Sequence, residues 1–282
     1  MKIGVSSYSY HNLVKQGGLQ EIGLPAQAVE AGFEMIEFSG LHAPAGEDRL
    51  AYAKRIRKAC DQAGIAIGNF AVGADFLNAA GGPEAEIGRL RAEVDLAAAL
   101  GAVSMRHDVT TGRRGTSFDS VLPELADYCR AVTEYAAGKG IRTMTENHGF
   151  FCQDSERLEK LVMAVQHPNY GILIDVGNFL CVDEEPALAV ARLAPYAFHL
   201  HVKDFHFKSG QEPDPGDGWF STRACNRLRG AIIGHGVVPI RQCLQIINQA
   251  GYPGDVSLEF EGMEDPLAGI RIGLQNLRRY LA

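Results

Sequence analysis

Helical and strand-like spacings of apolar residues alternate along this chain. Runs with apolar residues three and four positions apart end at a glycine, and a short run typical of a β-strand follows within a few residues. The pattern occurs five times, at Gly32, Gly64, Gly101, Gly140 and Gly251. Glycine readily takes the left-handed conformation that ends a helix, so each position predicts a helix that stops and leads into a strand.

The opening run and two runs without a preceding glycine bring the predicted strands to eight. They are residues 3–8, 34–38, 66–70, 103–107, 142–146, 171–175, 197–202 and 255–259. Helical spacing occupies residues 50–63, 84–100, 121–137, 155–165, 240–250 and 266–281. Strands that alternate with helices form a parallel sheet, and eight units in 282 residues favour a closed (β/α)8 TIM barrel that forms one domain over residues 1–282. No G-x-G-x-x-G turn follows the first strand, so a dinucleotide-binding open sheet is not indicated.

The segment after the seventh strand has little periodicity, from residue 205 to about residue 236. Proline, glycine and charged residues gather within it at residues 208–217. We expect a long loop here. In a barrel it would hang over the C-terminal face, where it would serve as a lid or an oligomer contact, or pack against the rim.

Composition narrows the class of protein. Hydrophobic residues make up 46% and charged residues 22%, which is typical of a folded globular chain. The net charge of -7 argues against binding to nucleic acid, no segment is long enough to span a membrane, and a small ligand is expected. The six cysteines form no C-x-x-C pair, and no basic leader with a long apolar stretch opens the chain, so we expect a cytoplasmic protein with reduced thiols. Its Ala-rich outer helix at residues 84–100 is compatible with a homo-oligomer.

Four residues that can ligate a metal lie at the ends of the fifth to eighth strands: Glu146, Asp175, His201 and Glu259. Singly, each is an ordinary strand-end residue. Neighbouring strands of a barrel bring their ends together, however, and three converging carboxylates would repel one another. A divalent cation would relieve that repulsion. Three carboxylates and an imidazole suit Mn²⁺ or Mg²⁺, with Co²⁺ and Zn²⁺ as alternatives, and leave about two positions for substrate oxygens.

The strand ends also carry short phrases, namely Glu146-Asn147-His148-Gly149, His201-Val202-Lys203-Asp204 and Glu259-Phe260-Glu261. Over essentially the whole chain, this ordered set resembles the xylose isomerase-like TIM-barrel superfamily, and within it the sugar phosphate isomerase/epimerase branch with its ketose 3-epimerases and inosose dehydratases. The resemblance implies a divalent metal held by the four residues and proton transfer by Glu146 and Glu259. We therefore expect a metal-dependent isomerase or epimerase of a small carbohydrate that acts next to a carbonyl through a metal-stabilised enediolate.

The chain departs from the ketose 3-epimerase pattern at positions that contact substrate. Asn178 stands where a histidine is typical, Cys152 lies near the place of an expected glutamate, and Phe207, beside Lys208, replaces an arginine. The alternative is therefore a dehydratase or lyase of a keto-inositol or keto-sugar on the same metal site. Two different classes of protein also stay open. One is a metal-dependent DNA-repair endonuclease, which the acidic balance disfavours, and the second is a non-catalytic sugar-binding or scaffold protein.

Further polar residues near the strand ends are candidates for contacting the substrate: His148, Asn178, Lys203, Glu37 and His107. His148 lies two residues beyond Glu146 on the same face, where its other role would be to orient that glutamate. Lys203 bears the same relation to the strand-seven histidine, and its other role would be to pair with Asp204 or Glu261. Glu261 also competes with the strand-eight glutamate as a ligand. For the candidates on the second and fourth strands, the ordinary expectation is a solvated position at the rim.

Overall fold

Eight parallel strands close into a barrel in the computed structural model, which describes residues 1–282. The spatial order of the strands is β1-β11-β7-β6-β5-β4-β3-β2, and β2 pairs with β1 to close the barrel. The bounds are β1 (Ile3–Ser6), β2 (Met35–Ser39), β3 (Ala66–Val72), β4 (Ser104–His107), β5 (Arg142–Glu146), β6 (Tyr170–Asp175), β7 (Ala197–Val202) and β11 (Val256–Leu258). The single-domain (β/α)8 fold is confirmed, and each predicted strand lies within two residues of its expected bounds.

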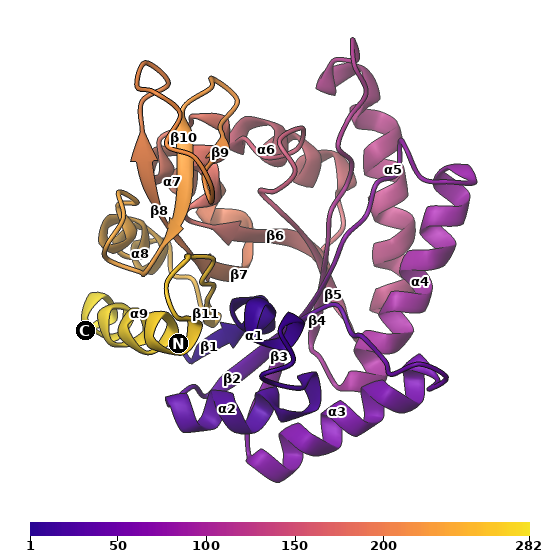
Figure 1. The fold of residues 1–282 in the computed structure, drawn as a ribbon. Helices are drawn as coiled ribbons and strands as arrows, with labels where there is room; N and C mark the ends of the chain where they lie inside the picture. Colours follow the sequence, from indigo (N-terminus) through magenta and orange to yellow (C-terminus); the bar gives the residue numbers. More distant parts are fainter.

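Helices surround the barrel on its outer side, apart from the short α1, which lies nearer the middle of the view (Figure 1). They are α1 (His11–Lys15), α2 (Leu24–Ala31), α3 (Arg49–Ala63), α4 (Gly82–Leu100), α5 (Phe118–Ala137), α6 (Ser155–Val165), α7 (Pro186–Leu193), α8 (Ile240–Gln249) and α9 (Pro266–Leu281). The six predicted helices are present. The others, α1, α2 and α7, have at most eight residues, too few turns to show a helical spacing.

The glycines that marked helix ends in the sequence take the expected conformation. All five, from Gly32 to Gly251, have a positive φ between 72° and 96°. Each ends a helix directly or lies within three residues of its last turn, and the following strand then starts at the base of the barrel.

Two separate sets of buried side chains result from this arrangement. The main core joins 67 buried residues, and it fills the space between the strands and the helices. Inside the barrel, strand alternation places Met144 and Leu173 on the same face as Glu146 and Asp175, one layer lower. On these two strands an apolar layer therefore lies beneath the acidic residues at the C-terminal ends.

The excursion after β7 contains a small antiparallel sheet of β8 (Asp204–Lys208), β9 (Phe220–Ser221) and β10 (Arg227–Ala231), which rises above the barrel (Figure 1). The expectation of a loop without regular structure is therefore wrong for part of residues 205–236. The strands have two to five residues, which is too short for an alternating pattern to be visible.

No helix of the chain combines the length and apolar character that crossing a membrane would require.

One buried carboxylate fixes the base of this sheet. Asp204 accepts hydrogen bonds from the backbone N–H groups of Phe205, Gly234, Gly236 and Val238. Both ends of the excursion are thereby tied to one side chain. Because its oxygens are engaged by the backbone, Asp204 has no ion pair with Lys203.

Candidate metal centre

The structure brings together the four residues at the ends of β5, β6, β7 and β11. One ligand atom each from Glu146, Asp175, His201 and Glu259 lies within 4.8 Å of the other three. The register explains this, because Asp175 is directly opposite His201 and the other two residues share the same inward-facing alternation. All four are buried, with relative exposures of 0% to 8%.

Basic side chains compensate part of the negative charge of this cluster. Lys203 Nζ lies 2.8 Å from Glu259 Oε2, 2.9 Å from Glu261 Oε1 and 3.3 Å from Asp175 Oδ2. Burial, with help from the neighbouring glutamates, raises the pKa of Asp175 to about 6 against the opposing effect of Lys203. For Glu259, burial acts in the same direction but is outweighed by Lys203 and His201, so its pKa is well below the usual range. The cluster thus holds charge that a cation would further balance.

Three buried atoms of the cluster lack hydrogen-bond partners, His201 Nε2 among them, and the other two face the remaining ligands, which tests whether a metal fits. His201 Nδ1 has no hydrogen bond, although it lies 3.6 Å from Glu259 Oε2 and 3.9 Å from Glu146 Oε1. Asp175 Oδ2 has no hydrogen bond either, and its charged neighbour is Lys203 at 3.3 Å. Buried acceptors are normally satisfied, and acceptors that face one point are suited to binding a cation there. Carboxylate oxygens and one imidazole nitrogen form a donor set that suits Mg²⁺ or Mn²⁺. The residues therefore fit a divalent metal.

Hydrogen bonds hold the two glutamates from opposite sides of the cluster. Asn178 Nδ2 donates to Glu146 Oε1 at 3.0 Å, and Arg106 Nε lies 2.7 Å from Glu146 Oε2. Ser6 Oγ donates to Glu259 Oε1 at 2.9 Å. Asn178 is 3% exposed, so the structure gives this predicted substrate contact a place against Glu146, within the wall of the site.

Arg106 is a site residue that the sequence analysis missed. It is 7% exposed, and besides Glu146 it pairs with Asp108, whose Oδ1 lies 2.9 Å from Nη2. His148 Nδ1 lies 3.0 Å from the same oxygen. Burial alone would raise the pKa of Asp108, but Arg106 and His148 lower it to about 2. One feature of the sequence could have indicated it, since Arg106 is the only arginine in a predicted strand whose other residues are uncharged or histidine.

His107 points away from the cluster. Its ring packs edge-on against Phe76, lies 6.3 Å from the ring of Tyr170, and is fully buried among the side chains outside the barrel wall. Strand alternation explains the difference, because Arg106 faces inward and its neighbour must then face outward. The structure therefore does not support the prediction that His107 contacts substrate.

Glu37 also lies away from solvent, at 1% exposure, inside the barrel. Its Oε1 lies 2.5 Å from His201 Nε2 and its Oε2 lies 2.9 Å from His199 Nε2. Both oxygens thus face protein side chains, and the prediction of a substrate contact is not supported here either. The physical reason is depth, because Glu37 lies below the C-terminal end of β2, in the middle of the barrel. The depth of a residue depends on the strand register, which the sequence does not show.

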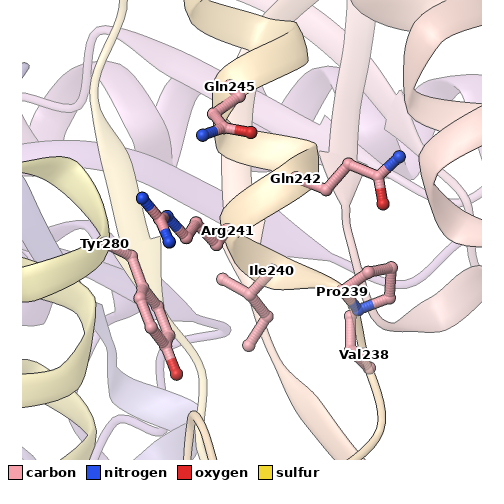
Figure 2. A pocket seen from close by; sticks show the side chains of 7 residues that line it. All are labelled: Val238, Pro239, Ile240, Arg241, Gln242, Gln245 and Tyr280. Carbon is pink, nitrogen blue, oxygen red and sulfur yellow. The ribbon is translucent and has the colours of Figure 1, made fainter.

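A hollow of about 210 Å³ opens above the cluster. It is lined by Tyr8, Ser39, Ala71, Arg106, Glu146, His148, His201, Lys203, Glu259 and Glu261. Two of the predicted substrate contacts, His148 and Lys203, therefore border open space beside the cluster. A larger hollow of about 460 Å³ lies between the start of α8 and the end of α9, lined by residues such as Arg241 and Tyr280 (Figure 2). It includes none of the clustered acids, so the smaller hollow is the candidate substrate site.

Comparisons with known proteins agree with this architecture. The family model for xylose isomerase-like TIM barrels matches residues 25–280. No curated protein matches the chain. Among solved structures, it is similar to the probable 3-DHS dehydratase AsbF from Bacillus anthracis, with 19% identity, 99% of each chain covered and a TM-score of 0.77.

Two further solved structures are similar over most of the chain. An L-ribulose 3-epimerase has 16% identity and a TM-score of 0.73, with 99% of this chain and 94% of that chain covered. A barrel protein from Mycobacterium smegmatis in complex with magnesium has 19% identity and a TM-score of 0.69, with 93% and 89% covered. At these identities the likeness shows the fold. The family match confirms the resemblance seen in the strand ends: the chain belongs to the xylose isomerase-like TIM-barrel family.

Proposed function

We propose that this chain is a divalent-metal-dependent enzyme that moves a proton at the carbon next to a carbonyl of a small polyhydroxylated substrate, as an isomerase or epimerase. The observation that carries the proposal is the convergence of Glu146, Asp175, His201 and Glu259 within 4.8 Å, with a hollow of about 210 Å³ above them. Both isomerising and eliminating chemistry occur on this fold, because its solved examples include an epimerase and a probable dehydratase.

The four residues would hold Mn²⁺ or Mg²⁺. When bound, such a cation supplies electrostatic stabilisation of the negative charge that develops on a carbonyl oxygen after a neighbouring proton leaves. Glu146 and Glu259 reach the hollow from β5 and β11, on either side of the other two ligands. Each keeps one oxygen anchored by a neutral donor, Asn178 or Ser6 respectively. They are therefore held at fixed positions, from which one can take a proton and the other can return it.

The carbon atom to which the proton returns, and the face on which it returns, decide which product forms. Return to the opposite face of the same carbon inverts that centre, and return to the neighbouring carbon moves the carbonyl. Lys203 lies beside Glu259 and borders the hollow, where its positive charge would favour a developing oxyanion. Burial opposes the charged form of Lys203, but Asp175, Glu259 and Glu261 outweigh it, so its pKa is well above the usual value.

A second candidate, dehydration of a keto-inositol or keto-sugar, is favoured by one specific observation. His148 borders the hollow, and its Nδ1 contacts the partly buried carboxylate of Asp108. Burial disfavours its charged form, but Asp108 outweighs burial and raises the pKa of His148. A protonated imidazole beside the two glutamates could donate a proton to a departing hydroxyl, a group that isomerisation does not need.

The test is incubation of the Mn²⁺-loaded protein in D₂O with a panel of ketoses and keto-inositols, followed by NMR. Deuterium at a substrate carbon without loss of water supports the isomerase or epimerase, whereas a conjugated, dehydrated product supports the second candidate. Glu146→Gln should abolish either reaction, because it removes a proton-transfer group. Glu86→Gln is the matched control, since Glu86 is a buried carboxylate paired with Arg89 on α4, outside the barrel. Equal activity of Glu146→Gln and wild type would contradict the proposal.

A further inference from the structure

We propose that Glu37 is a positioning residue that keeps the imidazole proton of His201 on Nε2 and so leaves Nδ1 free to bind a cation. This inference rests on the proposed metal site, and it assigns a role to a carboxylate that no step of the proposed reaction uses. Glu37 is the remaining acidic group inside the barrel that touches a proposed ligand without facing the hollow.

The two nitrogens of His201 face different surroundings. Nδ1 is directed toward the cluster, 3.6 Å from Glu259 Oε2, and Nε2 lies 2.5 Å from Glu37 Oε1 on the other side of the ring. A neutral imidazole carries its single proton on one nitrogen only. A carboxylate at Nε2 attracts the proton to that side, and the lone pair on Nδ1 is then directed at the other ligands.

Glu37 crosses the barrel to make this contact. It belongs to β2, whereas His201 belongs to β7, and β1 and β11 lie between these strands in the wall. The inward positions on the intervening strands are small: Gly4 and Ser257. A Cβ at Gly4 would lie 3.1 Å from Ser257 Oγ and 2.6 Å from Met35 Cε, so a larger residue would crowd the space over which Glu37 reaches.

The carboxylate itself is held in one orientation. His199 Nε2 lies 2.9 Å from Glu37 Oε2, and Ser257 Oγ donates to the same oxygen at 3.2 Å. These partners occupy Oε2 and leave Oε1 for His201. Glu37 therefore presents Oε1 to His201 in a fixed direction, which is what setting a tautomer requires.

The first experiment measures Mn²⁺ affinity by isothermal titration calorimetry for wild type, Glu37→Met, Glu37→Gln and the control Glu86→Gln. Outer carboxylate partners of metal-bound histidines typically contribute ~10- to 100-fold in affinity, so Glu37→Met should bind Mn²⁺ that much more weakly. Glu37→Gln keeps an oxygen acceptor and should lose less. Glu86→Gln should bind as wild type does. An affinity of folded Glu37→Met within about twofold of wild type would overturn the role of Glu37.

The second experiment needs no substitution at Glu37, so it decides the question even where Glu37→Met does not fold. Protein labelled with ¹⁵N-histidine and loaded with one equivalent of Zn²⁺, which is diamagnetic, reports which nitrogen of His201 carries the proton; His201→Gln assigns the signal. We expect a proton on Nε2 and the metal on Nδ1. A proton on Nδ1 would overturn the inference while leaving the metal site intact, whereas absence of any divalent-metal binding by wild type would overturn both proposals.

Discussion

The wall made of β5, β6, β7 and β11 and the wall made of β2, β3 and β4 carry their charged side chains in different ways. On the first, each predicted strand-end residue faces inward and joins one cluster. On the second, Glu37 lies deep in the barrel and pairs with histidines from β7, while His107 faces the helices and its neighbour Arg106 reaches the site. The first wall thus supplies the proposed ligands together with Lys203, and the second supplies Arg106 and Glu37, which contact Glu146 and His201.

The difference between the walls is one of register. A residue one position along a strand points to the opposite face, and a residue two positions lower points to a different layer. On β6 and β7 the pairing of Asp175 with His201 puts both at the same height. On β2, Glu37 pairs with Ser6, and a register shift between Ile36 and Phe38 displaces the upper end of the strand relative to β3.

The largest loss of stability is expected for Arg106, the residue of the second wall that pairs with Glu146 of the first wall. Replacing Arg106 by Met removes an ion-pair partner from the buried Glu146 and from the partly buried Asp108, and leaves Asp108 with only His148. Breaking a buried ion pair by removing one partner costs about 3–5 kcal/mol. Urea unfolding of metal-free protein should show that loss. A loss below about 1 kcal/mol would mean that the two walls are not coupled through this residue.

The matched control for Arg106→Met is Arg49→Met. Arg49 forms a bidentate ion pair with Glu93, and the pair lies outside the barrel. The Arg49 side chain is half exposed. Its removal should cost less than that of Arg106, because Arg89 Nη1 still lies 3.8 Å from Glu93 Oε1 after Arg49 is lost.

The next effect tests the first wall by itself. Asp175→Asn should weaken Mn²⁺ binding by more than ~100-fold, because it removes a ligand charge and not merely a group behind a ligand. The free energy of unfolding of the metal-free protein should not fall, since Asp175 is buried with a raised pKa and the amide oxygen can still accept from the N–H of Gly177. Calorimetry and urea unfolding check the two halves. Mn²⁺ binding within tenfold of wild type would remove Asp175 from the ligand set.

The sequence was sufficient for the fold because the barrel repeats one signal many times. Eight strands and six helices each leave a spacing pattern, and glycines such as Gly64 and Gly101 mark where helix gives way to strand. It was also sufficient to bring the four acidic and imidazole residues into one cluster, because all of them lie at equivalent ends of adjacent strands. It was not sufficient for Glu37, His107 and Arg106, whose roles depend on inward or outward direction and on depth in the barrel.

The small sheet above the barrel illustrates the same limit. β8 and β10 pair through a register that runs from Lys208 opposite Arg227 to Asp204 opposite Ala231. The pairing depends on Asp204, whose carboxylate binds backbone N–H groups about thirty positions away along the chain. A contact of this kind leaves no local periodicity, so the sequence predicted only an irregular segment.

A smaller effect on stability is expected from Asp108, and it should depend on pH. Asp108 has a pKa lowered to about 2 in the folded protein, against an ordinary value of 3.8. A lowered pKa contributes stability above the ordinary value, and that contribution disappears as the pH falls through the folded pKa; it is worth about 2 kcal/mol at neutral pH. Asp108→Asn should therefore be less stable than wild type at pH 7, and the difference should close between pH 4 and pH 2. A difference that stays constant with pH would contradict the ion pair.

The smallest effect is expected for His107, and it tests the outward direction of that residue. The ring packs among buried side chains, and its Nδ1 lies 2.7 Å from the carbonyl oxygen of Asp108, while Nε2 has no partner. His107→Leu removes one hydrogen bond but also one unsatisfied buried nitrogen, so the net loss of stability should be about 1 kcal/mol or less. Mn²⁺ affinity and turnover should stay within twofold of wild type, whereas His148→Gln, on the hollow, should lower turnover without lowering stability comparably. If His107→Leu impaired turnover as strongly as His148→Gln does, His107 on the second wall would face the substrate as well, and the contrast between the two walls would fail.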